Sequence, residues 1–259
     1  MNILCIGDVV SRTGREMLFS YLPELQQQKQ IDFIIANGEN ATHGRGLARP
    51  AYDELMQAGV DAITLGNHTW GAKDVVHLMQ YEDNIIRPAN FDRGCPGRGS
   101  MVLKASNGVR VGILNLIGRT YMNPCASPFE VADSEIAALR EKSDVLLVDF
   151  HAEATSEKIA MGWYLDGKVS AVFGTHTHVQ TSDETVLPKG SGYITDLGMT
   201  GPSHSVLGME RKIILDRFLT GMPQKFEIAS GKGQFSGCIF TIDTNSGHTT
   251  AVERIFYKE

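Results

Sequence analysis

The feature that most constrains the fold of this chain is a repeated pair, in which a short apolar run is followed at once by a small polar cluster. The runs cover residues 3–6, 31–36, 60–65, 145–150 and 169–173. Apolar runs of this length, bounded by glycine and polar residues, predict buried β-strands. In an open α/β sheet, ligand-binding side chains gather beyond the carboxyl ends of the strands. The five polar clusters are therefore expected to meet at one rim.

Helical patterns lie between the strand-like runs. Leucines at near-helical spacing predict a helix over residues 14–29, which Pro23 should kink or split. Further helices are expected over residues 50–58, from near Trp70 or Lys73, and over residues 127–142, 155–164 and 209–219. This alternation, interrupted by hairpins, predicts an α/β fold: a layered sandwich with mixed β-sheets flanked by helices, in a single domain over residues 1–259.

Glycine and proline mark the irregular parts of the chain. Asn107-Gly108 separates two apolar runs and predicts a hairpin. Residues 84–99 and the glycine-rich residues 198–208 are expected to be loops. Residues 225–257 are expected to form β-strands with turns near residues 231–233 and 243–247.

Composition excludes several classes of protein. The chain has 259 residues and a net charge of -6, with no lysine or arginine run, so stable nucleic-acid binding is not expected. No run approaches the roughly 20 apolar residues of a membrane span, and the N-terminus lacks the pattern of a signal peptide, so a cytoplasmic protein without membrane contact is expected. The four cysteines form no Cys-x-x-Cys pair and are expected to be reduced thiols.

The polar clusters contain oxygen and nitrogen donors that suit hard or borderline divalent metals. The candidate ligands are Asp8, Glu39, Asn40, Asn67, His151, His176 and His178. If residues 176–178 continue a strand, His176 and His178 point to the same side, because the side-chain period of a strand is two. Each histidine can then serve one of two neighbouring metals.

Charge favours a phosphate ester as the substrate of such a site. Two divalent cations, two carboxylates and one bridging hydroxide leave a charge of roughly +1 where lysine and arginine are scarce. His68 follows the candidate ligand Asn67 and is better placed to face the substrate than to bind metal. Its imidazolium can stabilise the transition state or protonate the leaving oxygen.

Each candidate also has an ordinary structural explanation. Asp8 can cap a helix, Glu39-Asn40 can form a solvated turn, and His151 can be a hydrogen-bonded core histidine. These explanations fail together, because they require a metal-competent donor to follow every strand by accident.

The motifs Gly7-Asp8, Gly66-Asn67-His68 and Gly174-Thr175-His176-Thr177-His178, with His151 between the last two, resemble the calcineurin-like metallophosphoesterase superfamily. Val10 stands where the usual Asp-x-His motif has its histidine. Gly38-Glu39-Asn40 replaces the usual Gly-Asp. Both departures resemble the YmdB-like branch of bacterial phosphodiesterases, and the resemblance covers nearly the whole chain.

The resemblance implies two metal sites and a substrate class. Asp8, Glu39, Asn40 and His178 would surround one metal, and Glu39, Asn67, His151 and His176 the other. Glu39 would bridge the metals and His68 would be the catalytic imidazole. Iron or manganese is the metal expected by analogy, with zinc as an alternative, and 2′,3′-cyclic nucleotides are the implied substrates. Similar proteins also suggest a homo-oligomer, for which residues 86–99 and 118–127 are candidate contacts.

The sequence thus predicts a dinuclear metal-dependent phosphodiesterase in which a metal-bridging hydroxide attacks phosphorus and His68 assists. One alternative is a phosphomonoesterase or nucleotidase, which would call for additional cations such as Arg45, Arg49 or Lys73. Another is a non-catalytic regulatory module that binds metal and nucleotide.

Overall fold

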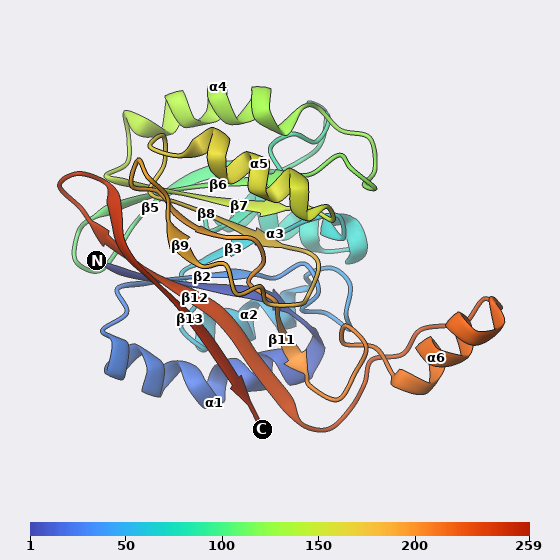
Figure 1. The fold of residues 1–259 in the computed structure, drawn as a ribbon. Helices are drawn as coiled ribbons and strands as arrows, with labels where there is room; N and C mark the ends of the chain where they lie inside the picture. Colours follow the sequence, from blue (N-terminus) through green and yellow to red (C-terminus); the bar gives the residue numbers. More distant parts are fainter.

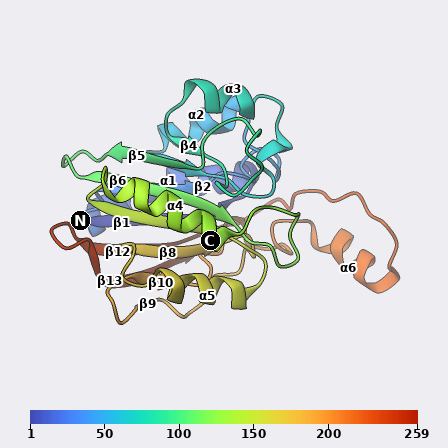
Figure 2. The ribbon, with the colours of Figure 1, turned by 90° about the horizontal axis from the view of Figure 1, so that it is seen from above.

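Two β-sheets stacked face to face form the centre of the molecule, and helices cover the outer face of each (Figures 1 and 2). The computed structural model describes residues 1–259. The layers run helix, sheet, sheet, helix, so the predicted α/β sandwich with mixed sheets is confirmed.

The first sheet has seven strands in the order β13-β12-β11-β1-β2-β3-β4. Strands β1, β2, β3, β4 and β11 run parallel. Strand β12 is antiparallel to β1 and β11, and β13 pairs antiparallel with β12 at the edge of the sheet. The strands are β1 Asn2–Val9, β2 Phe33–Asn37, β3 Ala62–Thr64, β4 Ile85–Ile86, β11 Met199–Pro202, β12 Gly233–Asp243 and β13 His248–Lys258.

The second sheet has six strands in the order β5-β6-β7-β8-β10-β9. Its centre is parallel, and an antiparallel strand closes each edge. The strands are β5 Ser100–Lys104, β6 Arg110–Ile117, β7 Val145–His151, β8 Ala171–Thr175, β9 Thr185–Val186 and β10 Gly192–Ile194. Strands β5 and β6 form the hairpin that Asn107-Gly108 predicts, and Gly108 has a φ of 90° in its turn.

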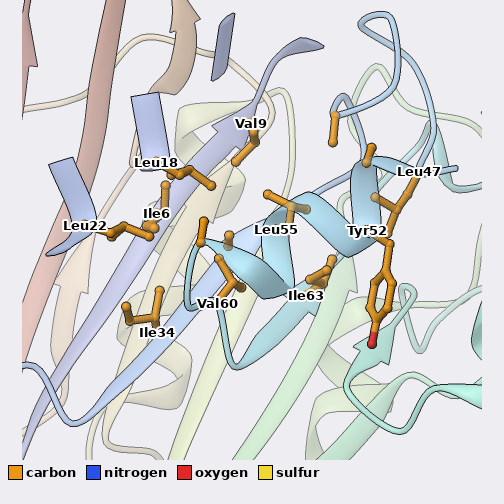
Figure 3. Close-up of a cluster of buried hydrophobic side chains, with 14 of the residues drawn as sticks. Ile6, Val9, Leu18, Leu22, Ile34, Leu47, Tyr52, Leu55, Val60 and Ile63 are labelled. Carbon is orange, nitrogen blue, oxygen red and sulfur yellow. The ribbon is translucent and has the colours of Figure 1, made fainter. Parts of the chain in front are cut away.

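Five helices pack on the sheets: α1 Ser11–Lys29, α2 Arg49–Gln57, α3 Val75–Tyr81, α4 Pro128–Arg140 and α5 Thr155–Leu165. Helices α1, α2 and α3 pack on the outer face of the first sheet, and α4 and α5 on that of the second. Figure 3 shows Leu18 and Leu22 of α1 and Leu55 of α2 directed at side chains of the sheet such as Ile6 and Ile34. A separate cluster of buried side chains fills the space between the sheets.

Some boundaries differ from the prediction. Helix α1 is one element through Pro23, because buried Leu22 and Leu25 hold both sides of the proline against the sheet. The expected loop over residues 198–208 contains β11, which pairs in parallel with β1. Residues 84–99 contain the short strand β4, and the C-terminal strands begin at Gly233 and not near residue 225. Strands β9 and β10 were not predicted. These strands are only two and three residues long, and they are defined by the pairing of β10 with β8 and of β9 with β10.

The sixth helix, α6 Arg211–Thr220, projects away from the sandwich on an extended arm (Figures 1 and 2). Leu215, Phe218 and Leu219 on this helix are more than half exposed. None of the helices combines the length and the apolar character needed to cross a membrane.

The layer between the sheets makes a testable prediction about stability. Phe173 on β8 and Phe240 on β12 pack across the interface with ring centroids 6.1 Å apart, and both are buried. We expect Phe173→Ala to lower the free energy of unfolding by about 3–5 kcal/mol, because it leaves a cavity that two sheets cannot close. Denaturant unfolding measures this. The matched control is Phe218→Ala, whose ring is 81% exposed and should contribute less than about 0.5 kcal/mol. Equal stabilities for the two variants would contradict this account of the core.

Candidate metal centre

The carboxyl ends of strands from both sheets meet at one rim, and all eight predicted site residues lie there. Asp8 is near the end of β1, and His151 is the last residue of β7. The others follow the ends of β2, β3 and β8: Glu39, Asn40, Asn67, His68, His176 and His178. Parallel strands bring these positions together because each strand ends at the same edge of its sheet.

One group of donors surrounds Nε2 of His151. This nitrogen lies 2.8 Å from Oδ1 of Asn67, 3.2 Å from Oε1 of Glu39 and 3.1 Å from Nδ1 of His176. The donor atoms of Glu39, His151 and His176 all lie within 4.8 Å of one another. His176 also meets Glu153, with 2.9 Å between Nε2 and a carboxylate oxygen.

A second group surrounds the side-chain amide of Asn40. Its Nδ2 lies 3.3 Å from Oδ1 of Asp8, 3.3 Å from Oε1 of Glu39 and 3.2 Å from Nε2 of His178. The distance between Nε2 of His178 and Oδ1 of Asp8 is 3.6 Å. Glu39 Oε1 therefore belongs to both groups and lies between them.

His68 faces this pair of groups from one side. Its Nδ1 lies 2.9 Å from Oδ1 of Asn40, and its backbone N–H donates to Oε2 of Glu39 at 2.8 Å. The side chain is about one-third exposed, and Nε2 has no partner within the protein.

The two histidines after β8 reach the rim by a route that the sequence did not predict. The expected strand-like alternation is wrong, because β8 ends at Thr175 and the backbone turns. His176 and His178 have φ angles of 95° and 63°, in the left-handed region that side chains rarely adopt. The turn sends His176 to the first group and His178 to the second. Such backbone strain persists where surrounding contacts impose it, typically at functional sites.

Electrostatics at the rim centre on two buried carboxylates. Burial alone would raise the pKa of Asp8, but the imidazoles of His178 and His151 hold this pKa below its ordinary value. The pKa of Glu39 is likewise lowered, because His151 outweighs the effect of burial. Burial would lower the pKa of His151, yet the carboxylates of Glu39 and Asp8 raise it to about 9. The protein thus holds two negative charges out of water and requires positive charge beside them.

The donor set fits divalent metal ions. Nδ1 of His176 and Nε2 of His151 face each other at 3.1 Å, and both lie near a carboxylate that can only accept. Burial and the neighbouring charge on His151 lower the pKa of His176 to about 3, so its ring is neutral at pH 7. The donors can approach this closely only because residue 66 is glycine. A Cβ there would collide with the ring of His151 and with Glu39.

Comparison with known proteins identifies the family. A family model described as YmdB-like protein matches residues 4–255. The 2′,3′-cyclic-nucleotide 2′-phosphodiesterase of Bacillus subtilis (strain 168) is 49% identical over 259 residues, which cover 100% of this chain and 98% of that protein. The chain belongs to the YmdB-like family.

Solved structures agree with this assignment. A hypothetical protein from Thermus thermophilus matches with a TM-score of 0.94 and 44% identity, over 100% of both chains. A novel phosphatase from Mycoplasma pneumoniae matches with a TM-score of 0.94 and 37% identity, over 100% of this chain and 93% of that one. The resemblance derived from the sequence motifs is confirmed.

This YmdB-like protein supports His151 through residues that sequence reasoning missed. Nδ1 of His151 lies 2.9 Å from Oγ1 of Thr175, which donates to Asp149 at 2.7 Å. Thr64 and Asn37 also donate to Asp149, whose pKa burial raises to about 6. The chain of hydrogen bonds orients the imidazole and directs Nε2 at the donor group. The sequence signal that could have revealed this network is a polar residue, such as Asp149, inside a buried strand.

A buried ion pair anchors the turn that carries His176 and His178. Nζ of Lys158 lies 2.6 Å from a carboxylate oxygen of Asp196, and both side chains are buried. Asp196 accepts the backbone N–H of Thr177 at 3.2 Å and that of Gly198 at 2.7 Å. One carboxylate therefore joins the histidine turn to the start of β11.

The support of His151 predicts a measurable effect on metal affinity. Thr175→Val keeps the shape of the side chain but removes the hydroxyl that joins His151 to Asp149. We expect Mn²⁺ to bind roughly 10- to 100-fold more weakly, as is typical when a partner of a metal-binding histidine is lost. Titration against a competing chelator measures the affinity. Thr185→Val, on the exposed strand β9, is the control and should bind like wild type. Equal affinities for the two variants would show that the hydroxyl does not support the site.

Proposed function

We propose that this protein is a dinuclear metal-dependent phosphodiesterase that hydrolyses small phosphodiesters, with 2′,3′-cyclic nucleotides as its substrate class. The observation that carries the proposal is the position of Glu39, whose Oε1 lies against both donor groups. A carboxylate shared between two sets of ligands is suited to bridging two metals. The name of the relative from Bacillus subtilis supports the substrate class.

The residues assigned to the metals are those of the two groups. Glu39, Asn67, His151 and His176 would hold one ion, and Asp8, Glu39, Asn40 and His178 the other. Bound divalent ions supply Lewis acidity toward phosphoryl oxygens and lower the pKa of water. Oxygen and imidazole donors are compatible with iron, manganese and zinc, and the family resemblance points to iron or manganese.

The amide of Asn40 connects the metal ligands to His68. Rotation of this amide by 180° keeps the atomic positions but turns Oδ1 toward Asp8, Glu39 and His178, as a ligand requires. The amide nitrogen then donates to Nδ1 of His68, which leaves the ring proton on Nε2. Burial lowers the pKa of His68 and favours the neutral ring in the free protein. Nε2–H is thus directed away from the ligands, where it can donate to an oxygen of the substrate.

The cations around the site favour a diester over a monoester. A monoester carries more negative charge and calls for additional positive groups. Arg49 is held by Asp53 at 2.8 Å and by Glu82 at 2.6 Å, so it is not free for substrate. The charge of Arg45 contributes to lowering the pKa of His68, so Arg45 is the arginine that lies near the site. We therefore expect a higher kcat/KM for bis-p-nitrophenyl phosphate than for p-nitrophenyl phosphate. The opposite order would favour the phosphomonoesterase alternative.

Two variants test the assignment of roles. Glu39→Gln weakens the proposed bridge, so we expect loss of bound metal, measured by elemental analysis, and loss of turnover on 2′,3′-cyclic AMP. His68→Ala should keep its metal but lower kcat by roughly 10²- to 10⁴-fold, because it removes the N–H that donates to the substrate oxygen and removes no ligand. Glu141→Gln, on an exposed carboxylate, is the control. Wild-type rates for both site variants would overturn the proposed function.

Tight nucleotide binding by the wild-type protein without turnover would favour a regulatory module.

A further inference from the structure

A small cleft opens beside the metal centre and shares Asn67 with it. Its volume is about 180 Å³. Its walls come from the segment after β3, from residues 91–95, and from residues 117–124. Residues 91–95 lie within one of the two loops that are candidates for self-association, and residues 117–124 overlap the other. Complete ligand sites typically measure about 300–1,000 Å³, so this cleft suits one part of a substrate whose phosphate lies elsewhere.

Two aromatic side chains form one wall of the cleft. The rings of Trp70 and Phe91 lie 6.1 Å apart at an angle of 34°. The side chain of Trp70 is 42% exposed, although it sits in the short helical turn Thr69–Gly71 that directly follows His68. The tilted contact with Phe91 steadies the indole and leaves part of it open to the cleft. An accessible indole fixed in this way is suited to stacking on a planar ring.

Two polar side chains line the same cleft without partners in the protein. The carboxylate of Asp92 and the side-chain amide of Asn123 make no hydrogen bond or ion pair within the chain, and both residues are exposed. A carboxylate accepts from an exocyclic amino group, and an amide both donates and accepts. Together with the indole, these groups match a nucleobase, which has a flat face and a polar edge.

The chemistry of the leaving group selects this side of the metal centre. When a 2′,3′-cyclic nucleotide is hydrolysed, the leaving oxygen belongs to the ribose that carries the base. The nucleoside must therefore lie on the side of His68, whose Nε2–H donates to the substrate oxygen. His68 stands between Asn67 and Trp70 in the chain, and both of these residues line the cleft.

A second groove, next to His178, suits this role less well. It measures about 410 Å³ and is lined by His178 but not by Asn67 or Trp70, which flank His68 in the chain. Its arginine, Arg254, is held at 3.3 Å by Glu184.

We propose that the cleft between Trp70 and Asn123 binds the nucleobase of the substrate, with the indole stacked on the base. This inference rests on the proposed function. Asp92 contacts the edge of the base and favours bases that carry an amino group over uracil, which presents a carbonyl oxygen at the corresponding position. The metal centre then supplies affinity for the phosphate, and this cleft supplies selectivity for the base.

Kinetics on matched substrates test the stacking. The two substrates are 2′,3′-cyclic AMP and the 2′,3′-cyclic phosphate of methyl riboside, which has no base. We expect Trp70→Ala to raise KM for cyclic AMP roughly 5- to 150-fold, the range typical of a lost base–aromatic stack, and to raise KM for the base-free compound by a much smaller factor. Trp70→Phe should fall between wild type and Trp70→Ala. Trp163→Ala, which removes a 57% exposed indole from α5, is the matched control and should behave as wild type. Equal factors on the two substrates, or no change, would overturn the proposal.

A binding measurement separates failure of the cleft from failure of the proposed function. The chain has two tryptophans, so Trp70 is the only indole in a Trp163→Phe protein. We expect 3′-AMP to quench its fluorescence with saturation in the metal-loaded protein, and methyl riboside 3-phosphate to leave it unchanged. Quenching without hydrolysis of any diester would keep the cleft and reject the phosphodiesterase. Hydrolysis of a diester without selective quenching would keep the phosphodiesterase and reject the cleft as the base-binding site.

Base preference tests Asp92. Wild type should favour 2′,3′-cyclic CMP over 2′,3′-cyclic UMP in kcat/KM, since the carboxylate accepts from the amino group of cytosine. Asp92→Asn should reduce this preference by roughly fivefold or more. An unchanged ratio would remove Asp92 from the proposal.

Discussion

Two carboxylates buried where the sheets meet are the constraint on which the rest of the site depends. Asp8 and Glu39 are 0% and 1% exposed, and isolated charges at such positions are strongly unfavourable. Imidazoles that follow strands of both sheets stabilise these charges. Two backbone N–H groups also donate to them, that of His176 to Asp8 and that of His68 to Glu39. Neither sheet alone could supply these partners. The site therefore forms only when one sheet packs on the other.

The sequence predicted the positions of the donors better than their surroundings. Apolar runs that end in a polar cluster locate the carboxyl ends of strands, and the parallel arrangement then brings the ends together. For that reason Asp8, Glu39 and His151 could be placed at one rim before the structure was known. The same logic failed for residues 176–178, because the turn there depends on Asp196, whose pairing with Lys158 joins segments that no local pattern links.

The supporting network was missed for a related reason. Asp149 and Thr175 lie inside strand patterns, where a polar residue reads as an interruption and not as a function. Their role follows only from contacts across neighbouring strands, with Thr64 and Asn37 from one sheet and His151 from the other. Likewise β11 consists of Met-Thr-Gly-Pro, a composition typical of a loop, and becomes a strand because β1 offers it a parallel edge.

The hydrogen bond at the base of the projecting arm extends the site beyond the sandwich. Nδ1 of His178 donates to the backbone carbonyl of Leu207 at 3.2 Å, which leaves Nε2 to face Asp8. Leu207 itself has a φ of 53°, so the carbonyl is held in an orientation that an unconstrained leucine would seldom adopt. The tautomer of one imidazole is thus fixed by a segment that belongs to neither sheet. Trimming that connection would release the ring of His178 even though both sheets, and the other donor residues at the rim, stayed in place.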